Sequence, residues 1–548
     1  MNQTPGVRDH RLYIGLAVLL AALWLAGLGQ RPLFNPDEGR YAEIPREMLA
    51  SGDWVLPHLN GLVYAEKPPL QYWATALSYQ WFGLNEFAAR LYGALCALGT
   101  IALIWAVANR LGGEQAAWRA AAMLSGMLIF AVLGHLLTLD MSLTFYLTLS
   151  FTGFLFAQPI RNQPTHARFW MLLAWVAAAL GVMTKGIVAA AIPAAVLVLY
   201  TLWTRDFAAW RRLQLPLGPA LFLLIAVPWH WLAARRDGDF LEFYFVHEHV
   251  ARYLTPVAQR VEPWWFFLAV FVAGTAPWTL SALRVLVSGW RRTGTSGFDA
   301  RLFLWIWAAF IMVFFSLSDS KLMPYILPVM PAVALLVAVS TPQVLRRDYL
   351  ITAAFTLIFG AGLGIACFRW PQLLSASDRG AFFLPLAKTA AKVGALLFVS
   401  GAFVLAQGAR DATRAGVFLG AGWCLAWIWI GVDAAALGPV YSGLDLARSI
   451  PDSDHSAPIY SVATYDQTVD FYLAHSVTLV RFRGELDYGL NKNPAVEIPD
   501  LPEFERRWSN DSQAFAVMEP SMYEKLRNDG LPIRVIGRTA VRLMAARR

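Results

Sequence analysis

The chain has 548 residues, of which 57% are hydrophobic and 15% are charged, and its mean hydropathy is +0.47. These values indicate a polytopic membrane protein with room for one soluble domain. The net charge of +8 comes without a basic low-complexity tract or a nucleic-acid motif, which excludes nucleic acid as a partner and favours anionic lipid. The three cysteines, Cys96, Cys367 and Cys424, lie in apolar runs and show neither a disulfide nor a metal-ligand spacing.

About thirteen apolar runs are long enough to cross roughly 30 Å of hydrocarbon. The first, Leu12–Leu28, is followed by Gln30-Arg31-Pro32 without a small-residue cleavage pattern, so we expect a retained span and not a signal peptide. The shorter segment Leu70–Phe82 is rich in tyrosine and tryptophan and predicts an interfacial helix. The runs lie at about 12–29, 88–108, 120–137, 140–158, 168–184, 187–204, 215–234, 264–288, 301–317, 323–341, 349–368, 386–406 and 416–437.

Arginines predict the orientation of the spans. Alternate short loops, from the one with Arg8 and Arg11 to the one with Arg410 and Arg414, each carry at least a pair of arginines, which places them in the cytoplasm. An odd number of spans then puts the last stretch of the chain outside.

Residues 439–548 lack the long apolar runs of the preceding sequence. Short β-type runs at 458–462, 477–482, 514–518 and 533–536 alternate with polar, helix-compatible segments such as 501–507. The pattern predicts a soluble α/β domain on the outer face. Residues 1–438 are then the transmembrane part, with juxtamembrane helices in a first outer loop at 30–87.

The segment just after the first span holds two adjacent carboxylates and an arginine. Asn35 as N-cap and Glu38 as the acid of a capping box would make it an ordinary helix start. Capping explains Glu38 better than Asp37, which shares a helix face with Arg40. Ionisable residues beside membrane spans are costly, so we predict that Asp37 is functional.

Further ionisable residues fall in the outer loops. Lys67 follows Glu66 and precedes a diproline, whose stiff backbone would aim the lysine; a lysine that merely snorkels to water needs no such support. Asp140 opens a span and is either a partner of the helix dipole or a site residue. Lys185 fills a tight turn and is either an interfacial anchor or a phosphate contact.

His247 and His249 are candidate metal ligands, with Glu66 as a third, and zinc as the metal. An i, i+2 pair does not share a helix face, and the usual zinc spacings are missing. Arg252 and Lys321 are equally able to bind phosphate oxygens.

Together these motifs resemble the GT-C class of polyprenyl-phosphate-dependent glycosyltransferases, and within it the family that transfers 4-amino-4-deoxy-L-arabinose to lipid A, a relative of the protein O-mannosyltransferases. The resemblance is carried by Asn35-Pro36-Asp37-Glu38-Gly39-Arg40-Tyr41, Glu66-Lys67-Pro68-Pro69-Leu70-Gln71-Tyr72-Trp73, Glu86-Phe87-Ala88-Ala89-Arg90, Thr184-Lys185-Gly186, Glu248-His249 with Arg252, and Ser320-Lys321 with Tyr325.

The resemblance implies a bacterial inner-membrane enzyme, acting as a monomer, with its active site on the periplasmic side. The donor would be undecaprenyl phosphate-linked aminoarabinose and the acceptor a lipid A phosphate, with inversion at the anomeric carbon and resistance to polymyxin as the outcome. No cofactor would be required. The implied catalytic residues are Asp37, Lys67 and Asp140, and the implied phosphate-binding residues are Arg40, Lys185, Arg252, Lys321 and Tyr325.

The residue chemistry fits that reaction, because a phosphate donor and a phosphate acceptor need several cations around them. Asp37 is either a general base, an acceptor-orienting carboxylate or a contact for the donor's amino group. Two alternatives stay open. One is a protein or polysaccharide glycosyltransferase with the same carrier; the other is a lipid transporter or flippase, which should show midplane charges and repeated halves.

Overall fold

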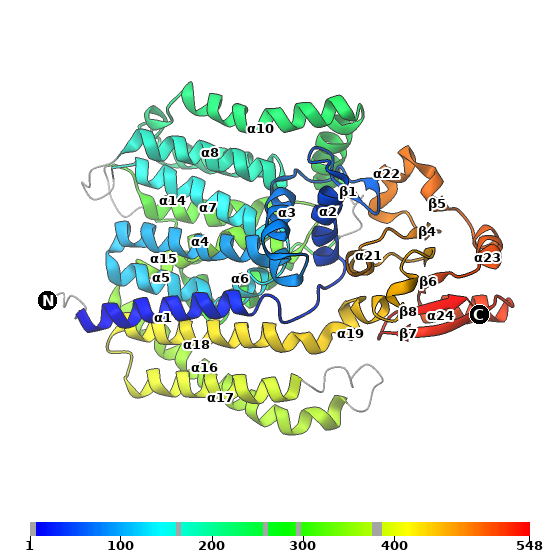
Figure 1. The fold of residues 1–548 in the computed structure, drawn as a ribbon. Helices are drawn as coiled ribbons and strands as arrows, with labels where there is room; N and C mark the ends of the chain where they lie inside the picture. The colour runs from blue at the N-terminus through cyan, green and yellow to red at the C-terminus, as the bar shows by residue number, and fades with distance from the viewer. Residues whose placement is uncertain (1–6, 160–165, 256–260, 292–296, 375–385, 548) are drawn as a thin grey trace. The chain divides into compact units, whose positions relative to one another are not determined.

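The computed structural model describes residues 7–159, 166–255, 261–291, 297–374 and 386–547 (Figure 1). The chain divides into two compact units. The first comprises Met1–Gly27, Leu91–Phe368 and Lys388–Gly431, and the second comprises Leu28–Arg90, Arg369–Ala387 and Val432–Arg548. The second unit thus contains, besides the last stretch of the chain, the first outer loop and Arg369–Ala387, both of which we expected within the membrane-spanning part.

The first unit is a bundle of long apolar helices (Figure 1). Its elements are α1 (Val7–Ala26), α4 (Glu86–Gly112), α5 (Glu114–Gly126), α6 (Leu128–Leu133), α7 (Leu139–Ala157), α8 (Ala167–Lys185), α9 (Val188–Thr204), η1 (Trp210–Arg212), α10 (Leu217–Arg236), the π-helix η2 (Glu242–Ala251), α11 (Arg252–Leu254), α12 (Phe266–Gly274), α13 (Thr279–Ser288), α14 (Ala300–Ser316), η4 (Met323–Val329), α15 (Met330–Ala338), α16 (Pro342–Leu374), α17 (Leu386–Ala406) and α18 (Ala412–Asp433).

Each of the predicted apolar runs is occupied by helix. Two of them are interrupted, since α5 gives way to α6 and α12 to α13. Within the described residues, seven helices are long and apolar enough to cross a membrane, and five shorter apolar helices accompany them. The polytopic helical fold is therefore confirmed, whereas the number of spans stays a prediction.

The antiparallel pair α7 and α8 is the part of the bundle that positions functional residues. The two helices pack along each other, and α8 also packs along α9 and α10. Because α7 begins at Leu139 and α8 ends at Lys185, the start of one helix lies beside the end of the other. Deeper in the bundle, Phe151 of α7 stacks on Trp307 with ring centroids 4.3 Å apart.

The second unit combines the first outer loop with the C-terminal domain. Its elements are α2 (Asp37–Ser51), β1 (His58–Leu59), β2 (Leu62–Val63), α3 (Leu70–Phe82), η6 (Ala434–Leu437), α19 (Gly438–Tyr441), α20 (Leu444–Ala447), η7 (Asp452–Asp454), β3 (Ile459–Val462), α21 (Gln467–Leu473), β4 (Thr478–Val480), η8 (Gly484–Leu486), α22 (Asp487–Lys492), η9 (Pro494–Val496), β5 (Glu497–Ile498), α23 (Leu501–Asn510), β6 (Phe515–Met518), α24 (Pro520–Asn528), β7 (Ile533–Arg538) and β8 (Leu543–Arg547).

The C-terminal domain is built on a six-stranded sheet with the order β5-β4-β3-β6-β8-β7. The first four strands are parallel, and β8 pairs antiparallel with both β6 and β7. Phe504 and Trp508 of α23 are fully buried in its core with Tyr460. The predicted soluble α/β domain is thus confirmed, as is the helix predicted at Leu70–Phe82.

Helix α2 packs on α21, which follows strand β3. The contact is so close that a Cβ on Gly39 would lie 2.7 Å from the backbone nitrogen of Thr468. Only glycine at this position lets α2 lie against the start of α21, so the C-terminal domain supports the helix that carries Asp37 and Arg40.

Candidate active site

The two adjacent carboxylates at the start of α2 have opposite environments. The side chain of Asp37 is 52% exposed, whereas that of Glu38 is 2% exposed. One carboxylate is therefore available to a substrate and the other is part of the protein interior.

Glu38 is held by two arginines. Its carboxylate accepts hydrogen bonds from Arg31 at 2.6 and 3.0 Å, from Arg90 at 2.8 and 3.0 Å, and from the backbone nitrogen of Phe34 at 2.9 Å. Burial raises the pKa of the Glu38 carboxyl, but the charges of Arg31 and Arg90 outweigh it and hold that pKa well below its usual range. The expected capping box is wrong: Pro36 occupies the N-cap, without a capping side chain, and Glu38 binds the arginines because a buried carboxylate requires cations.

Arg40 links Asp37 to the C-terminal domain. Its guanidinium lies 3.4 Å from the Asp37 carboxylate and also forms an ion pair with Glu485, which in turn accepts a hydrogen bond from Gln467 at 2.6 Å. The buried Nε of Arg40 has no hydrogen-bond partner within the described part of the chain. Such a donor would be satisfied by a bound anion.

The Glu66–Lys67 pair lies in the same unit. The Lys67 ammonium donates to the backbone oxygen of Glu66 at 2.8 Å and lies 4.0 Å from the Glu66 carboxylate. Burial raises the pKa of the Glu485 carboxyl, Arg40 lowers it in part, and the charge of Glu66 adds to the increase. Glu66 is thus within electrostatic range of the carboxylate that holds Arg40.

The first unit brings together three residues predicted from separate segments. Lys185, at the end of α8, forms an ion pair with Asp140, at the start of α7, and its ammonium lies 4.7 Å from the ring centroid of Tyr325. Both charged side chains are largely buried. A partly desolvated lysine held by a carboxylate and an aromatic ring is a compact cationic site for an anion.

The π-helix η2 borders this cluster. A Cβ on Gly186, whose φ is +100°, would lie 2.2 Å from Nε2 of His249, so a glycine is required beside Lys185. The His249 Nδ1 hydrogen-bonds to the backbone oxygen of Tyr244 at 2.6 Å. His249 therefore lies at the same end of the bundle as Lys185.

Two cationic side chains that we predicted to bind phosphate form hydrogen bonds with other groups of the protein. Arg252 donates to the buried Glu248 carboxylate at 2.5 Å, and the buried Lys321 ammonium donates to the backbone oxygen of Ser318 at 2.6 Å. Glu248 also lies 3.5 Å from His247. The role of these cations in phosphate binding stays a prediction.

The predicted metal site draws on both units, with Glu66 in one and His247 and His249 in the other. Across the ranges that the structure describes, no group of three or more His, Cys, Asp and Glu side chains is arranged to hold a metal ion. A site formed from Glu66, His247 and His249 stays a prediction.

Two residues that hold the site, Glu485 and Arg90, are not predicted from the sequence, although Arg90 belongs to the motif at 86–90. Arg90 follows Glu38 by 52 residues, and Glu485 follows Arg40 by more than 400, so no local pattern connects them. The one general indication is that a buried carboxylate needs cations, which predicts arginine partners for Glu38 but not which arginines they are.

Comparison with known proteins yields two family models and a solved structure. The model for the aminoarabinose transferase C-terminal domain matches residues 447–547, and the model for dolichyl-phosphate-mannose-protein mannosyltransferase matches residues 10–244. The crystal structure of ArnT from Cupriavidus metallidurans bound to undecaprenyl phosphate aligns with a TM-score of 0.88 at 32% sequence identity, covering 99% of this chain and 98% of that one. The chain belongs to the ArnT family of aminoarabinose transferases.

Proteins named as undecaprenyl phosphate-alpha-4-amino-4-deoxy-L-arabinose arabinosyl transferases are among its relatives. The protein from Erwinia tasmaniensis is 29% identical over 94% of this chain and 95% of its own length. Arabinosyl transferase 1 of Sodalis glossinidius is 36% identical over 60% of this chain, a match that spans 59% of that relative's length. The resemblance to the ArnT family is confirmed, and as a member the chain is a transferase.

Proposed function

We propose that this protein transfers 4-amino-4-deoxy-L-arabinose from undecaprenyl phosphate to a phosphate group of lipid A. The proposal places it in the bacterial inner membrane with its active site on the periplasmic side. Reduced negative charge of lipid A, and hence resistance to polymyxin, would follow.

The observation that carries the proposal is the pairing of Asp37 with Arg40. An exposed carboxylate lies 3.4 Å from a buried guanidinium that keeps an unused donor. Such a pair suits a reaction in which both a polar sugar and a phosphate must be bound. The relative from Cupriavidus metallidurans was crystallised with undecaprenyl phosphate, which supports a lipid phosphate as the donor's carrier.

The proposed step is an in-line displacement. An oxygen of the acceptor phosphate attacks the anomeric carbon and forms a new C–O bond, while the bond from that carbon to the carrier phosphate breaks. Undecaprenyl phosphate leaves with the electron pair, so negative charge grows on its oxygen. A cation at that oxygen lowers the barrier, and Lys67, which lies in the same unit as Asp37 and Arg40, is the candidate.

Asp37 has an orienting role in this proposal. A phosphate monoester is largely ionised near neutral pH, so its oxygen attacks without first losing a proton to a base. The exposed Asp37 carboxylate then positions the acceptor through Arg40 or contacts the positively charged amino group of the sugar. A hydroxyl acceptor, in contrast, would need Asp37 as a true base.

The experiment uses the purified full chain in lipid vesicles with undecaprenyl phosphate-linked aminoarabinose. Lipid A with its phosphates and lipid A from which they have been removed are the two acceptors. We expect transfer to the phosphorylated acceptor alone, and loss of transfer with Asp37→Asn and Lys67→Ala in correctly inserted protein. Transfer to a peptide or polysaccharide hydroxyl and not to lipid A would contradict this proposal. It would favour the alternative of a protein or polysaccharide glycosyltransferase that uses the same lipid carrier.

A further inference from the structure

A groove runs along the start of α1 in the first unit. Its volume is about 450 Å³, and it lies between α1, the end of α17, the loop 407–411 and the start of α18. Leu12 and Phe403, on its two sides, are 52% and 44% exposed. Since α17 and α18 are both candidate membrane spans, the groove opens toward lipid tails along its length and ends at the polar loop that joins the two helices.

The two ends of the groove differ in polarity. Its apolar walls include Leu12, Phe403 and Phe418, and its polar end carries Arg410 and Arg414. The space is therefore amphipathic in the same sense as a phospholipid, with cations where the headgroup would lie.

The charge at the polar end favours an anion. Asp411 is the acid in the lining, and its Oδ1 accepts from the backbone nitrogens of Thr413 at 2.8 Å and Arg414 at 3.1 Å. The Asp411 carboxylate is thereby directed to the start of α18, and it lies 3.8 Å from the Arg414 guanidinium. A third arginine, Arg346, donates to the backbone oxygen of Gly408 at 3.2 Å.

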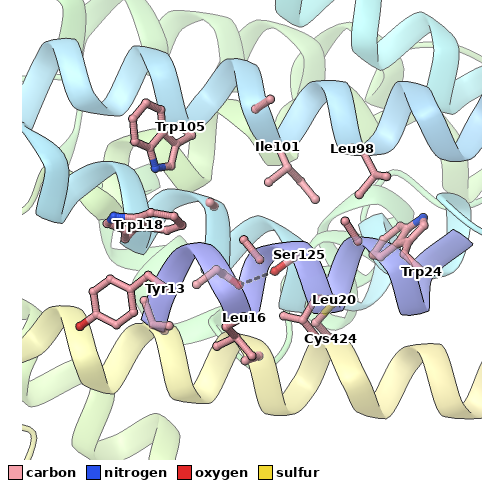
Figure 2. Close-up of a pocket in the computed structure, with 17 residues that line it drawn as sticks. Tyr13, Leu16, Leu20, Trp24, Leu98, Ile101, Trp105, Trp118, Ser125 and Cys424 are labelled. Carbon is pink, nitrogen blue, oxygen red and sulfur yellow. Dashed lines mark hydrogen bonds between the residues drawn. The ribbon is translucent and has the colours of Figure 1, made fainter. Parts of the chain in front are cut away.

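A second cavity borders the other side of α1 and provides a contrast (Figure 2). Its volume is about 370 Å³, and its walls come from α1, α4, α5 and α18, with Trp105, Trp118 and Ile101 facing the space. Tyr13 lines both cavities. None of the described residues that line this second cavity is charged, so it suits hydrocarbon better than an anionic headgroup.

We propose that the groove between α1, α17 and α18 binds an anionic phospholipid, with its phosphate between Arg410 and Arg414 and an acyl chain along Leu12, Phe403 and Phe418. Two arginines at a membrane surface favour an anionic over a zwitterionic headgroup, and hydrocarbon fills space that water would not occupy favourably. The site is independent of the proposed sugar transfer, because none of its residues belongs to the candidate active site.

The test is native mass spectrometry of the full chain after removal of co-purified lipid. Phosphatidylglycerol, phosphatidylcholine and inorganic phosphate are titrated separately and in competition. The probe variant is Arg410→Gln/Arg414→Gln. The matched control, Arg205→Gln/Arg211→Gln, removes two exposed arginines away from the groove, one directly after α9 and one in η1.

We expect phosphatidylglycerol to bind the wild type about thirtyfold more tightly than phosphatidylcholine, since two arginines at about 1 kcal/mol each contribute about 2 kcal/mol toward an anionic lipid. The probe variant should lose that preference, while the control keeps it. Equal binding of the two lipids by the wild type, or an unchanged preference in the probe variant, would overturn the proposal. So would displacement of phosphatidylglycerol by equimolar inorganic phosphate, which would identify an anion site without a lipid.

Discussion

The contrast between Asp37 and Glu38 gives the sharpest prediction, because neutralising each adjacent carboxylate should have a different consequence. Glu38→Gln neutralises the carboxylate that lies between the buried guanidinium groups of Arg31 and Arg90. Breaking a buried ion pair by removing one partner costs about 3–5 kcal/mol. Asp37→Asn weakens a half-exposed pair with Arg40, which is worth about 0–1 kcal/mol.

These free energies convert into measurable shifts of the melting temperature. A domain of 150–250 residues loses about 2–4 °C per kcal/mol, so Glu38→Gln should melt roughly 6–20 °C below the wild type. Asp37→Asn should stay within about 4 °C of the wild type while sugar transfer is lost. The matched control is Glu503→Gln, at a half-buried glutamate paired with the exposed Arg506 and Arg507, which should change stability by less than about 1 kcal/mol.

The assay is tryptophan fluorescence of purified protein during heating, followed by transfer activity measured on the same preparations. The reasoning fails if Glu38→Gln melts with the wild type, since Glu38 would then not hold the arginines together. It also fails if Asp37→Asn melts as early as Glu38→Gln, because lost activity would then reflect lost structure.

Three further predictions concern the periphery of the site. The pKa of Glu47 is raised to about 8, first by burial and then by the neighbouring Glu43 carboxylate, so the folded state keeps a proton that the unfolded state releases above about pH 4.5. The free energy of unfolding should consequently fall by on the order of 2–3 kcal/mol between pH 5 and pH 7. In melting curves recorded across this pH range, Glu47→Gln should remove most of the dependence of stability on pH. Glu485→Gln should raise KM for the acceptor more than it lowers kcat, because it loosens Arg40 without touching Asp37, and it should also lower the melting temperature, because Arg40 is buried and loses a charged partner. An unchanged KM in steady-state kinetics would remove Glu485 from the site. Gly186→Ala should lower stability by about 1–3 kcal/mol in the same melting assay, because its φ is +100° and its Cβ would overlap the neighbouring histidine.

Elements with a strong local pattern could be predicted from the sequence. The aromatic helix Leu70–Phe82 was predicted with both ends correct, and the β-type run at 514–518 became β6. Strand β8 (Leu543–Arg547) was missed, because two of its five residues are alanine and its sequence does not alternate. Strand β5 (Glu497–Ile498), with two residues, is too short to give a pattern.

In the candidate site too, some features could be predicted from the sequence and others could not. Asp37, Lys67, Asp140 and Lys185 stood out because ionisable residues beside apolar runs are conspicuous. Which of them pair could not be predicted, since the contact of Asp140 with Lys185 depends on the antiparallel packing of α7 and α8. The grouping of the first outer loop with the C-terminal domain depends likewise on tertiary contacts, such as the one at Gly39, that no local pattern encodes.

The central claim, transfer of aminoarabinose to lipid A, is tested most directly by mass spectrometry of lipid A from a suitable Gram-negative host. The host makes the lipid-linked aminopentose but lacks a transferase of its own, and it expresses either this chain or its Asp37→Asn variant. The account predicts that lipid A gains the mass of one aminopentose for each modified phosphate with the wild-type chain alone. Unmodified lipid A in cells that contain correctly inserted wild-type protein would contradict it.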